Sequence, residues 1–135
     1  MSAALKGGCI YFLLVFAAGF LLGIARVLIR APLLGEASAV LIELPVILVL
    51  SWFRCRTLIE RLRVPATLSA RGLMGATAFI LLLATELLLS VILFDRTIAE
   101  ALEIYRTVGG LMGLTGQIVF ALFPLIQLAT ASASE

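Results

Sequence analysis

The chain has 135 residues, of which 63% are hydrophobic and 13% are charged, with a formal net charge of +2. A soluble domain of this length cannot bury so much apolar surface in its own core, so the excess must face lipid. Four spans of about 20 residues with short connections use nearly all of the chain and exclude a sizeable soluble domain. We therefore expect one membrane domain over residues 1–135, an all-α integral membrane bundle of about four transmembrane helices.

The first two predicted spans cover residues 8–29 and 37–53. The first is an apolar run that carries Arg26 near its end and stops before Pro32, where proline disfavours continued helix. The second run contains Glu43 and an internal proline, which membrane helices tolerate because neighbouring groups satisfy the freed backbone. Each of these two spans therefore carries one ionisable residue into the apolar region.

Residues 54–71 are predicted to form the main polar loop, because their charge density is too high for hydrocarbon. The basic residues of this loop are Arg54, Arg56, Arg61, Arg63 and Arg71. With Lys6 they place six basic residues on the side shared by the N-terminus and the loop, against four on the other side. Both termini and the loop are therefore expected to be cytoplasmic. Tyr11 and Trp52, near span ends, are predicted interface anchors.

The third and fourth predicted spans cover residues 72–94 and 107–128. Glu86 is the one charge inside the third run, and Gln117 lies inside the fourth. Between them, residues 97–106 alternate apolar and charged positions in a way that predicts a short interfacial helix. Its apolar face is expected to contain Ile98, Leu102 and Tyr105.

Short glycine patterns recur along the chain. The quartet GLMG opens both later spans, at residues 72–75 and 110–113. Duplication in a repeat-built transporter would explain it, but small residues recur at helix contacts in any membrane bundle, and this second explanation is favoured. GxxxG spacings at residues 19–23 and 109–113 predict close helix contacts, within the chain or between copies.

Several classes of function are disfavoured by what the sequence lacks. It has no histidine, and Cys9 and Cys55 lack the paired spacing of zinc or iron–sulfur sites, so we expect no metal and no cofactor. The basic residues lie mostly at span ends, which indicates membrane topology and not nucleic-acid binding. With no GxSxG elbow and no phosphate loop, we do not expect an enzyme. The expected partners are the lipid bilayer and either further copies of the chain or a larger membrane complex.

One polar residue in each predicted span is costly in lipid and needs a partner. The four are Arg26, Glu43, Glu86 and Gln117. At about 1.5 Å of helical rise per residue, both glutamates lie about 12 Å from the non-cytoplasmic ends of their spans, the arginine about 7 Å and the glutamine about 15 Å. The four can therefore converge on one intramembrane polar layer in the outer half of the bundle.

The charge balance of this layer leaves two functions open. One arginine neutralises one carboxylate, and we expect Arg26 to pair with Glu43, which leaves Glu86 as the protonatable group. The favoured interpretation is structural: the layer fixes helix register in a non-enzymatic accessory or assembly component. The alternative is a small proton-coupled transporter or channel that uses Glu86, with or without Glu43.

The run GIARVLIRAPLLGEASAVLIELP, residues 23–45, resembles a group of small bacterial inner-membrane proteins that have no assigned function. The segments RGLMGATAF and TGQIVFALFPLIQ extend the resemblance over most of the chain. It implies a four-helix protein of the bacterial inner membrane and supplies no activity or ligand. The chain does not resemble the small multidrug exporters, whose carboxylate lies in the first helix, where this sequence has Arg26. That departure counts against an exporter of that family.

Overall fold

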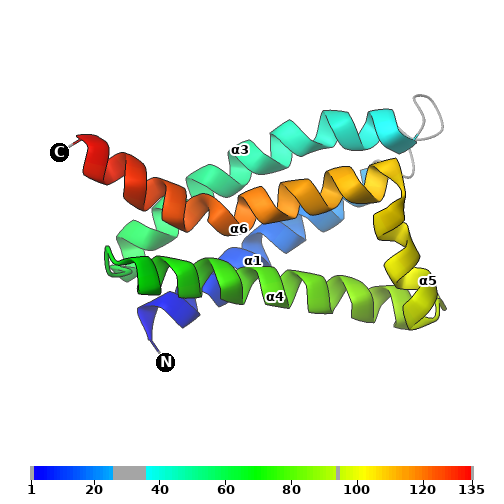
Figure 1. The fold of residues 1–135 in the computed structure, drawn as a ribbon, viewed down its shortest axis with the longest axis horizontal. Coiled ribbons are helices and arrows are strands. Elements are labelled where there is room, and N and C mark those ends of the chain that lie inside the picture. The colour runs from blue at the N-terminus through cyan, green and yellow to red at the C-terminus, as the bar shows by residue number, and fades with distance from the viewer. Residues whose placement is uncertain (1, 26–35, 94, 135) are drawn as a thin grey trace.

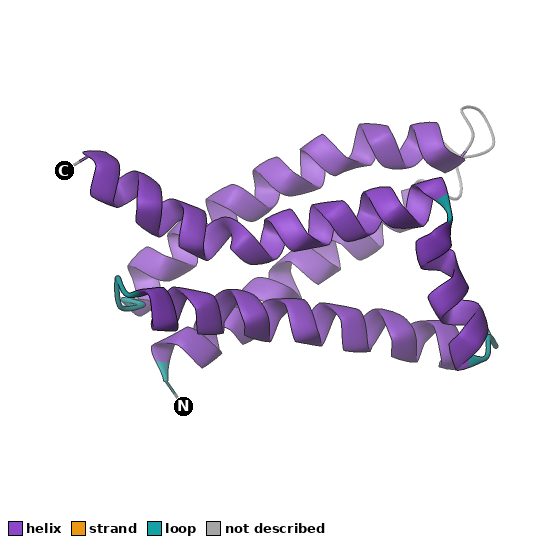
Figure 2. Ribbon diagram, in the orientation of Figure 1, coloured by secondary structure: helices purple, strands orange, loops and turns teal. Residues whose placement is uncertain are grey.

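A computed structural model describes residues 2–25, 36–93 and 95–134, and this part of the chain is helical, with no strand (Figure 2). The helices are α1 (Ala3–Ala25), α3 (Glu36–Leu62), α4 (Leu68–Ile92), α5 (Ile98–Glu103), the 3-10 helix η2 (Ile104–Arg106) and α6 (Val108–Ser134). The predicted all-α bundle is thus confirmed. The short helix predicted over residues 97–106 is also present, as α5 and η2.

The four long helices lie side by side and form one bundle (Figure 1). Helix α1 packs against α3 and α4, and α6 packs against the same two helices, so α1 and α6 occupy opposite corners. Helices α3 and α4 occupy the other two corners: they follow each other in the chain, but in the described part their backbones make no contact across the centre. The middle of the bundle is therefore either filled by side chains or left open.

The connection between α3 and α4 is shorter than the predicted polar loop 54–71. Helix α3 continues to Leu62, and α4 begins at Leu68 after Thr67, whose side chain accepts a hydrogen bond from the backbone N–H of Ala70. Arg63 adopts a positive φ of 54°, and the N–H of Val64 returns to the carbonyl of Ile59, a common way to end a helix. Most of the expected loop is therefore helix that extends beyond the apolar run.

Three helices of the described part are long and apolar enough to cross a bilayer, the pattern of a membrane protein. They contain the segments Ala3–Leu22, Leu68–Ile92 and Gly110–Thr130. Helix α3 differs because its apolar stretch shares the helix with Glu43 and with the arginines that follow residue 53. By length and composition the structure thus supports three spans in its described residues, against the four or so expected.

Large apolar side chains are exposed along all four long helices. Leu21, Val49, Ile80 and Leu111 are each more than half exposed, and they come from α1, α3, α4 and α6 in turn. Soluble monomers rarely expose contiguous apolar surface on every side. Lipid contact around the whole bundle accounts for this distribution.

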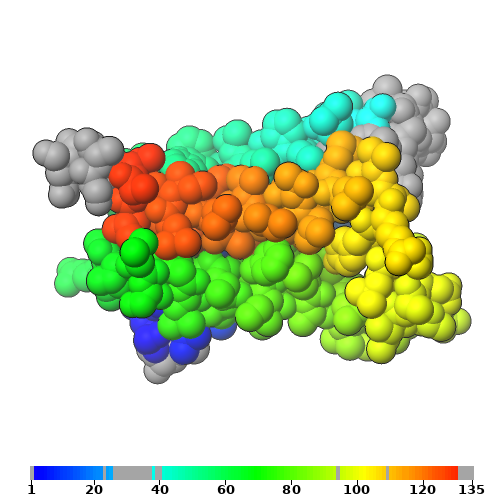
Figure 3. All heavy atoms as spheres, viewed as in Figure 1, coloured from blue at the N-terminus to red at the C-terminus, as the bar shows by residue number. Residues whose placement is uncertain are grey.

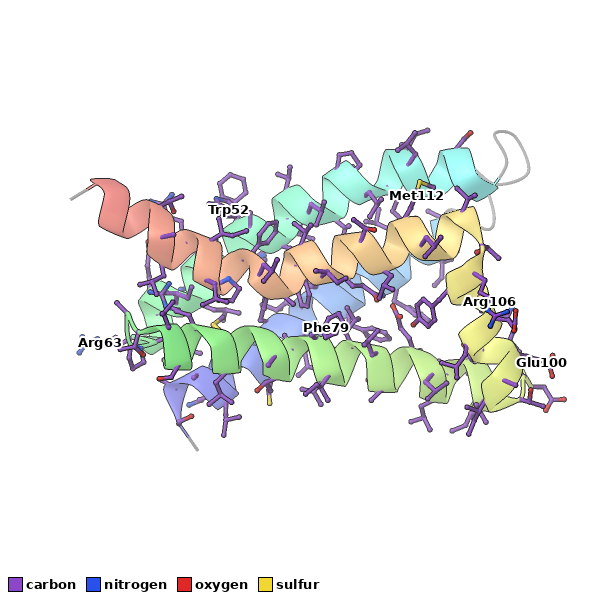
Figure 4. All side chains as sticks on the ribbon, in the orientation of Figure 1. Trp52, Arg63, Phe79, Glu100, Arg106 and Met112 are labelled. Carbon is purple, nitrogen blue, oxygen red and sulfur yellow. The ribbon has the colours of Figure 1, made fainter. Side chains whose placement is uncertain are left out.

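The buried core lies at one end of the bundle, which we call the packed end. Its largest fully buried side chains include Tyr11, Met74 and Cys55, from three different helices. The N-terminus, the α3–α4 turn and the C-terminus all lie toward this end (Figure 1). Arg63 lies at the packed end, whereas Glu100 and Arg106 lie at the opposite one (Figure 4).

At the opposite end, α5 and η2 cross from α4 to α6 (Figures 1 and 3). Helix α5 begins with a capping box: the Thr97 side chain accepts from the N–H of Glu100, and the Glu100 carboxylate accepts from the N–H of Thr97. Such reciprocal caps stabilise a helix start that would otherwise leave backbone donors unpaired. This corner positions η2 against the bundle interior.

Candidate functional site

The carboxylate of Glu86, on α4, accepts two hydrogen bonds from two other elements. The side-chain amide of Gln117, on α6, donates from Nε2 to Oε1 at 2.6 Å. The hydroxyl of Tyr105, on η2, donates to Oε2 at 3.3 Å. We call these three residues the Glu86 cluster.

Both donors in the Glu86 cluster are neutral groups. No basic side chain in the described ranges forms an ion pair with Glu86; the ion pairs found there join Arg56 to Glu60 and Arg106 to Glu103, at the surface. Hydrogen bonds from neutral donors offset only part of the cost of removing a carboxylate from water. Glu86 can therefore still bind a proton or a cation.

The Glu86 cluster lines a central cavity of about 930 Å³. Side chains from α1, α3, α4 and α6 form its wall, and η2 contributes at one end. Most of the lining is apolar, and its polar side chains include Glu43, Ser51, Glu86, Tyr105 and Gln117. A largely apolar cavity of this size with a few convergent polar groups is typical of a small-molecule site.

The structure brings together part of the predicted polar layer. Glu86 and Gln117 are hydrogen-bonded, and Glu43, only 9% exposed, lines the same cavity from α3. Arg26 and its expected pairing with Glu43 lie outside the described residues. The calculated depths thus identified three residues that share one cavity.

Tyr105 belongs to the site, although the sequence predicted it only as part of the apolar face of a short interfacial helix. The 3-10 turn of η2 and the following corner direct it inward instead: the Thr107 hydroxyl donates to the Ile104 carbonyl and accepts from the N–H of Gly110. An added Cβ on Gly110 would collide with the Ile104 carbonyl, so this corner requires a glycine. In the sequence, this corner is marked by Gly110, the first residue of the second GLMG quartet.

The environment of Tyr105 keeps its hydroxyl protonated. Burial, followed by the adjacent Glu86 carboxylate and the hydrogen bond to it, raises the pKa of Tyr105 to about 12. A neutral tyrosine remains a donor toward Glu86 across the physiological pH range.

A second polar cluster fills the centre of the packed end. Pro124 has no N–H, so the carbonyl of Phe120, four residues earlier in α6, loses its helical partner. The hydroxyl of Tyr11, on α1, donates to that carbonyl at 2.8 Å, and its ring stacks on Phe120 with centroids 4.2 Å apart. Tyr11 is fully buried, so the prediction that it anchors the chain at the membrane interface was wrong.

Arg71, expected in the polar loop, also belongs to the packed end. Its side chain is 7% exposed, and Nη1 donates to the carbonyl of Pro124 at 3.2 Å. Cys55, fully buried on α3, lies near both Arg71 and Tyr11. The Gln127 amide adds a hydrogen bond to the Trp52 carbonyl at 2.9 Å. The hydrogen bonds of Arg71 and Gln127 join neighbouring helices, whereas the Tyr11–Phe120 hydrogen bond and the proximity of Cys55 to Arg71 link the diagonal pairs α1–α6 and α3–α4.

Within the chain, glycines mark close helix approaches at Gly8 and Gly75, which do not belong to the GxxxG spacings. Added Cβ atoms would strike the Met74 carbonyl, at 2.7 Å, from Gly8, and the Ala121 carbonyl from Gly75. At Gly113 such an atom would meet nothing within 4 Å, and at Gly19 only the Ile47 side chain at 4.0 Å. Within the chain, Gly19 and Gly113 border the cavity instead of a tight contact.

Comparison with protein-family models, with curated proteins and with solved structures gives no match for this chain. The resemblance to small bacterial inner-membrane proteins stays a prediction. Among the described residues no three side chains of the histidine, cysteine, aspartate or glutamate type are grouped as a metal site would require.

Proposed function

We propose that this protein is a small carrier in the membrane that binds a solute in its central cavity and couples solute binding to a proton on Glu86. The observation that supports this most is a carboxylate whose hydrogen-bond partners among the described residues are both neutral, in the wall of a cavity of about 930 Å³. A charged side chain at the middle of a membrane helix costs about 2.5–3.5 kcal/mol on insertion scales. A chain tolerates such a cost where the charge exchanges with a proton or a bound ion.

We also propose an orientation for the protein and the membrane in which it lies. Lys6 belongs to the first turns of α1, and Arg54, Arg56, Arg61 and Arg63 belong to the C-terminal part of α3 and the turn after it. These segments lie toward the packed end, together with both termini (Figure 1). By the positive-inside rule we place the packed end at the cytoplasmic face of a bacterial inner membrane. The cavity then lies toward the outer half of the bilayer. The proposal involves no catalytic step and no cofactor.

A second candidate function is that of an accessory or assembly component. The 2.6 Å hydrogen bond between Glu86 and Gln117 joins α4 to α6, which favours a structural role for the same residues. In that case the partner is a larger membrane complex or further copies of the chain. Extraction in mild detergent followed by mass determination distinguishes a defined hetero-complex from a lone chain or homo-oligomer.

The decisive experiment compares wild type with Glu86→Gln in sealed vesicles that contain a pH-sensitive dye. A panel of neutral, anionic and cationic apolar solutes is added across a pH gradient. We expect at least one class to change the internal pH with wild type and none to do so with Glu86→Gln. Glutamine keeps the size and hydrogen bonding of the side chain, so the folded protein should persist.

Glu60→Gln is the matched control, because Glu60 is an exposed carboxylate whose side chain is 67% accessible. It should behave as wild type. If wild type moves no protons with any class of solute, or if Glu86→Gln moves them equally well, the carrier proposal is wrong. Loss of assembly in Glu86→Gln, without any proton movement by wild type, would support the structural role.

A further inference from the structure

The Glu86 cluster contains hydrogen-bond acceptors that outnumber their donors. A charged carboxylate can only accept, so the Gln117 amide must turn its NH2 group toward Glu86. That orientation leaves the amide oxygen, Oε1, buried and without a hydrogen-bond donor from any described residue. A buried oxygen without a donor costs about 1–3 kcal/mol. The site therefore lacks an N–H or O–H group, not another acceptor.

The rest of the cavity indicates that a ligand supplying the missing donor group also has an apolar body. Aliphatic and aromatic side chains form most of the wall, including Phe16 and Phe20 from α1 and Phe120 from α6. Aromatic faces also attract cations in desolvated surroundings. A ligand that combines positive charge, N–H groups and a hydrophobic body matches all of these features.

We propose that the cavity binds apolar primary and secondary amines in their protonated form, with the ammonium group on Glu86 and Gln117. This inference rests on the proposed carrier function and names its class of substrate. The ammonium N–H groups donate to the Glu86 carboxylate and to the amide oxygen of Gln117. A quaternary ammonium ion of the same size has the charge but cannot donate.

Protons and amines compete for the same carboxylate in this arrangement. The titratable groups that face the cavity with Glu86 are Tyr105 from η2 and Glu43 from α3; the described part of α1 contributes none. Tyr105 stays neutral, as described above. Protonation of Glu86 removes the charge that holds the ammonium group, so amine affinity should fall as the pH is lowered.

The experiment uses four compounds with one adamantyl body: the primary amine, its trimethylammonium analogue, the alcohol and the carboxylic acid. Binding to purified wild-type protein in detergent is measured by calorimetry, with protein-free detergent as the blank. A second set with a biphenylmethyl body repeats the series. We expect the primary amines to bind at least about ten-fold more tightly than their three analogues, as hydrogen bonds to charged groups imply.

Variants locate the binding to the cavity. Glu86→Gln should weaken amine binding by about ten-fold or more, and Glu86→Asp should retain part of it because the charge remains. Gly113→Leu should abolish binding by filling the cavity, since an added side chain there meets open space. Gly72→Leu, at an equally open glycine outside the cavity, should bind as wild type. Thermal unfolding verifies that each variant is folded.

Each other outcome overturns the inference. Equal affinity for the quaternary ions shows that N–H donation is not recognised, and tighter binding of the alcohols or acids shows that the cavity selects another class. If neither amine binds, the inference is wrong. The proposed function is tested separately, because proton movement driven by a neutral or anionic solute through Glu86 would leave the carrier proposal standing while the amine proposal fails.

Discussion

The two ends of the bundle are built from the same four helices, but one has a filled centre and the other has a cavity. At the packed end Tyr11, Cys55, Arg71 and Met74 are almost completely buried and fill the centre of the bundle. At the other end the centre is a cavity lined by Glu86 and its partners. Small residues produce both results: Gly75 lets α6 approach α4, whereas Gly113 removes a side chain from the cavity wall. The neighbour opposite a glycine therefore decides whether that glycine lets two helices approach or leaves open space between them.

The largest effect is expected from adding a methyl group at the close approach of α4 and α6 in the packed end. Gly75→Ala should lower the free energy of unfolding by about 1–3 kcal/mol, because the new methyl group meets the Ala121 backbone, which cannot rotate away as a side chain would. Thermal unfolding in detergent measures this. Gly72→Ala, in the same GLMG quartet but with open space, should be neutral or slightly stabilising. Equal effects of the two substitutions would contradict the proposed difference between them.

The Tyr11 hydroxyl should matter only while Pro124 leaves a carbonyl unpaired. Tyr11→Phe should cost about 1 kcal/mol of unfolding free energy, because the Phe120 carbonyl loses its donor. In a Pro124→Ala background the new backbone N–H pairs with that carbonyl, and the same change should cost clearly less. The double-mutant cycle in denaturant isolates this coupling. Strict additivity would show that the hydroxyl does not compensate for the proline.

At the cavity end, the α5 cap should have a local effect. Thr97→Ala removes one half of the capping box and should destabilise the short helix by about 1 kcal/mol without changing global unfolding. Faster hydrogen exchange of the amides in residues 98–103 would report it. Thr115→Ala, which removes a hydroxyl bonded within its own helix, serves as the control. If exchange rises equally at the packed end, α5 is not an independent cover of the cavity.

The smallest effect is a change in the titration of Tyr105. Its pKa of about 12 in the folded protein exceeds the ordinary value of 10.0, so its contribution to stability is present below pH 10 and is lost as the pH rises toward 12. Tyrosinate absorbance in a Tyr11→Phe background follows this residue alone. Glu86→Gln should shift the midpoint downward, because it removes the nearby negative charge. An unchanged midpoint would place Tyr105 outside the influence of Glu86.

The sequence predicted the helical bundle well because apolar runs and helical rise are properties of the chain itself. Helical rise also placed Glu43, Glu86 and Gln117 at similar depth, and all three line one cavity. The direction of Tyr105 was not predictable in this way, because a 3-10 turn changes which face a side chain occupies. Tyr11 was expected at the membrane interface and Arg71 in the polar loop, because sequence patterns do not reveal partners that are distant in the chain. Their partners are carbonyls of α6 near a proline, more than 50 residues away in the chain.

Phe120 takes part in both ends of the molecule. Its ring borders the cavity, while its carbonyl is the one that Pro124 leaves open and Tyr11 closes. A molecule that displaces Phe120 from the cavity wall would therefore act directly at the point where Pro124 interrupts the backbone hydrogen bonds of α6. Occupation of the cavity would thus bear on a contact of the packed end, the stacking of the Tyr11 ring on Phe120, through a single residue.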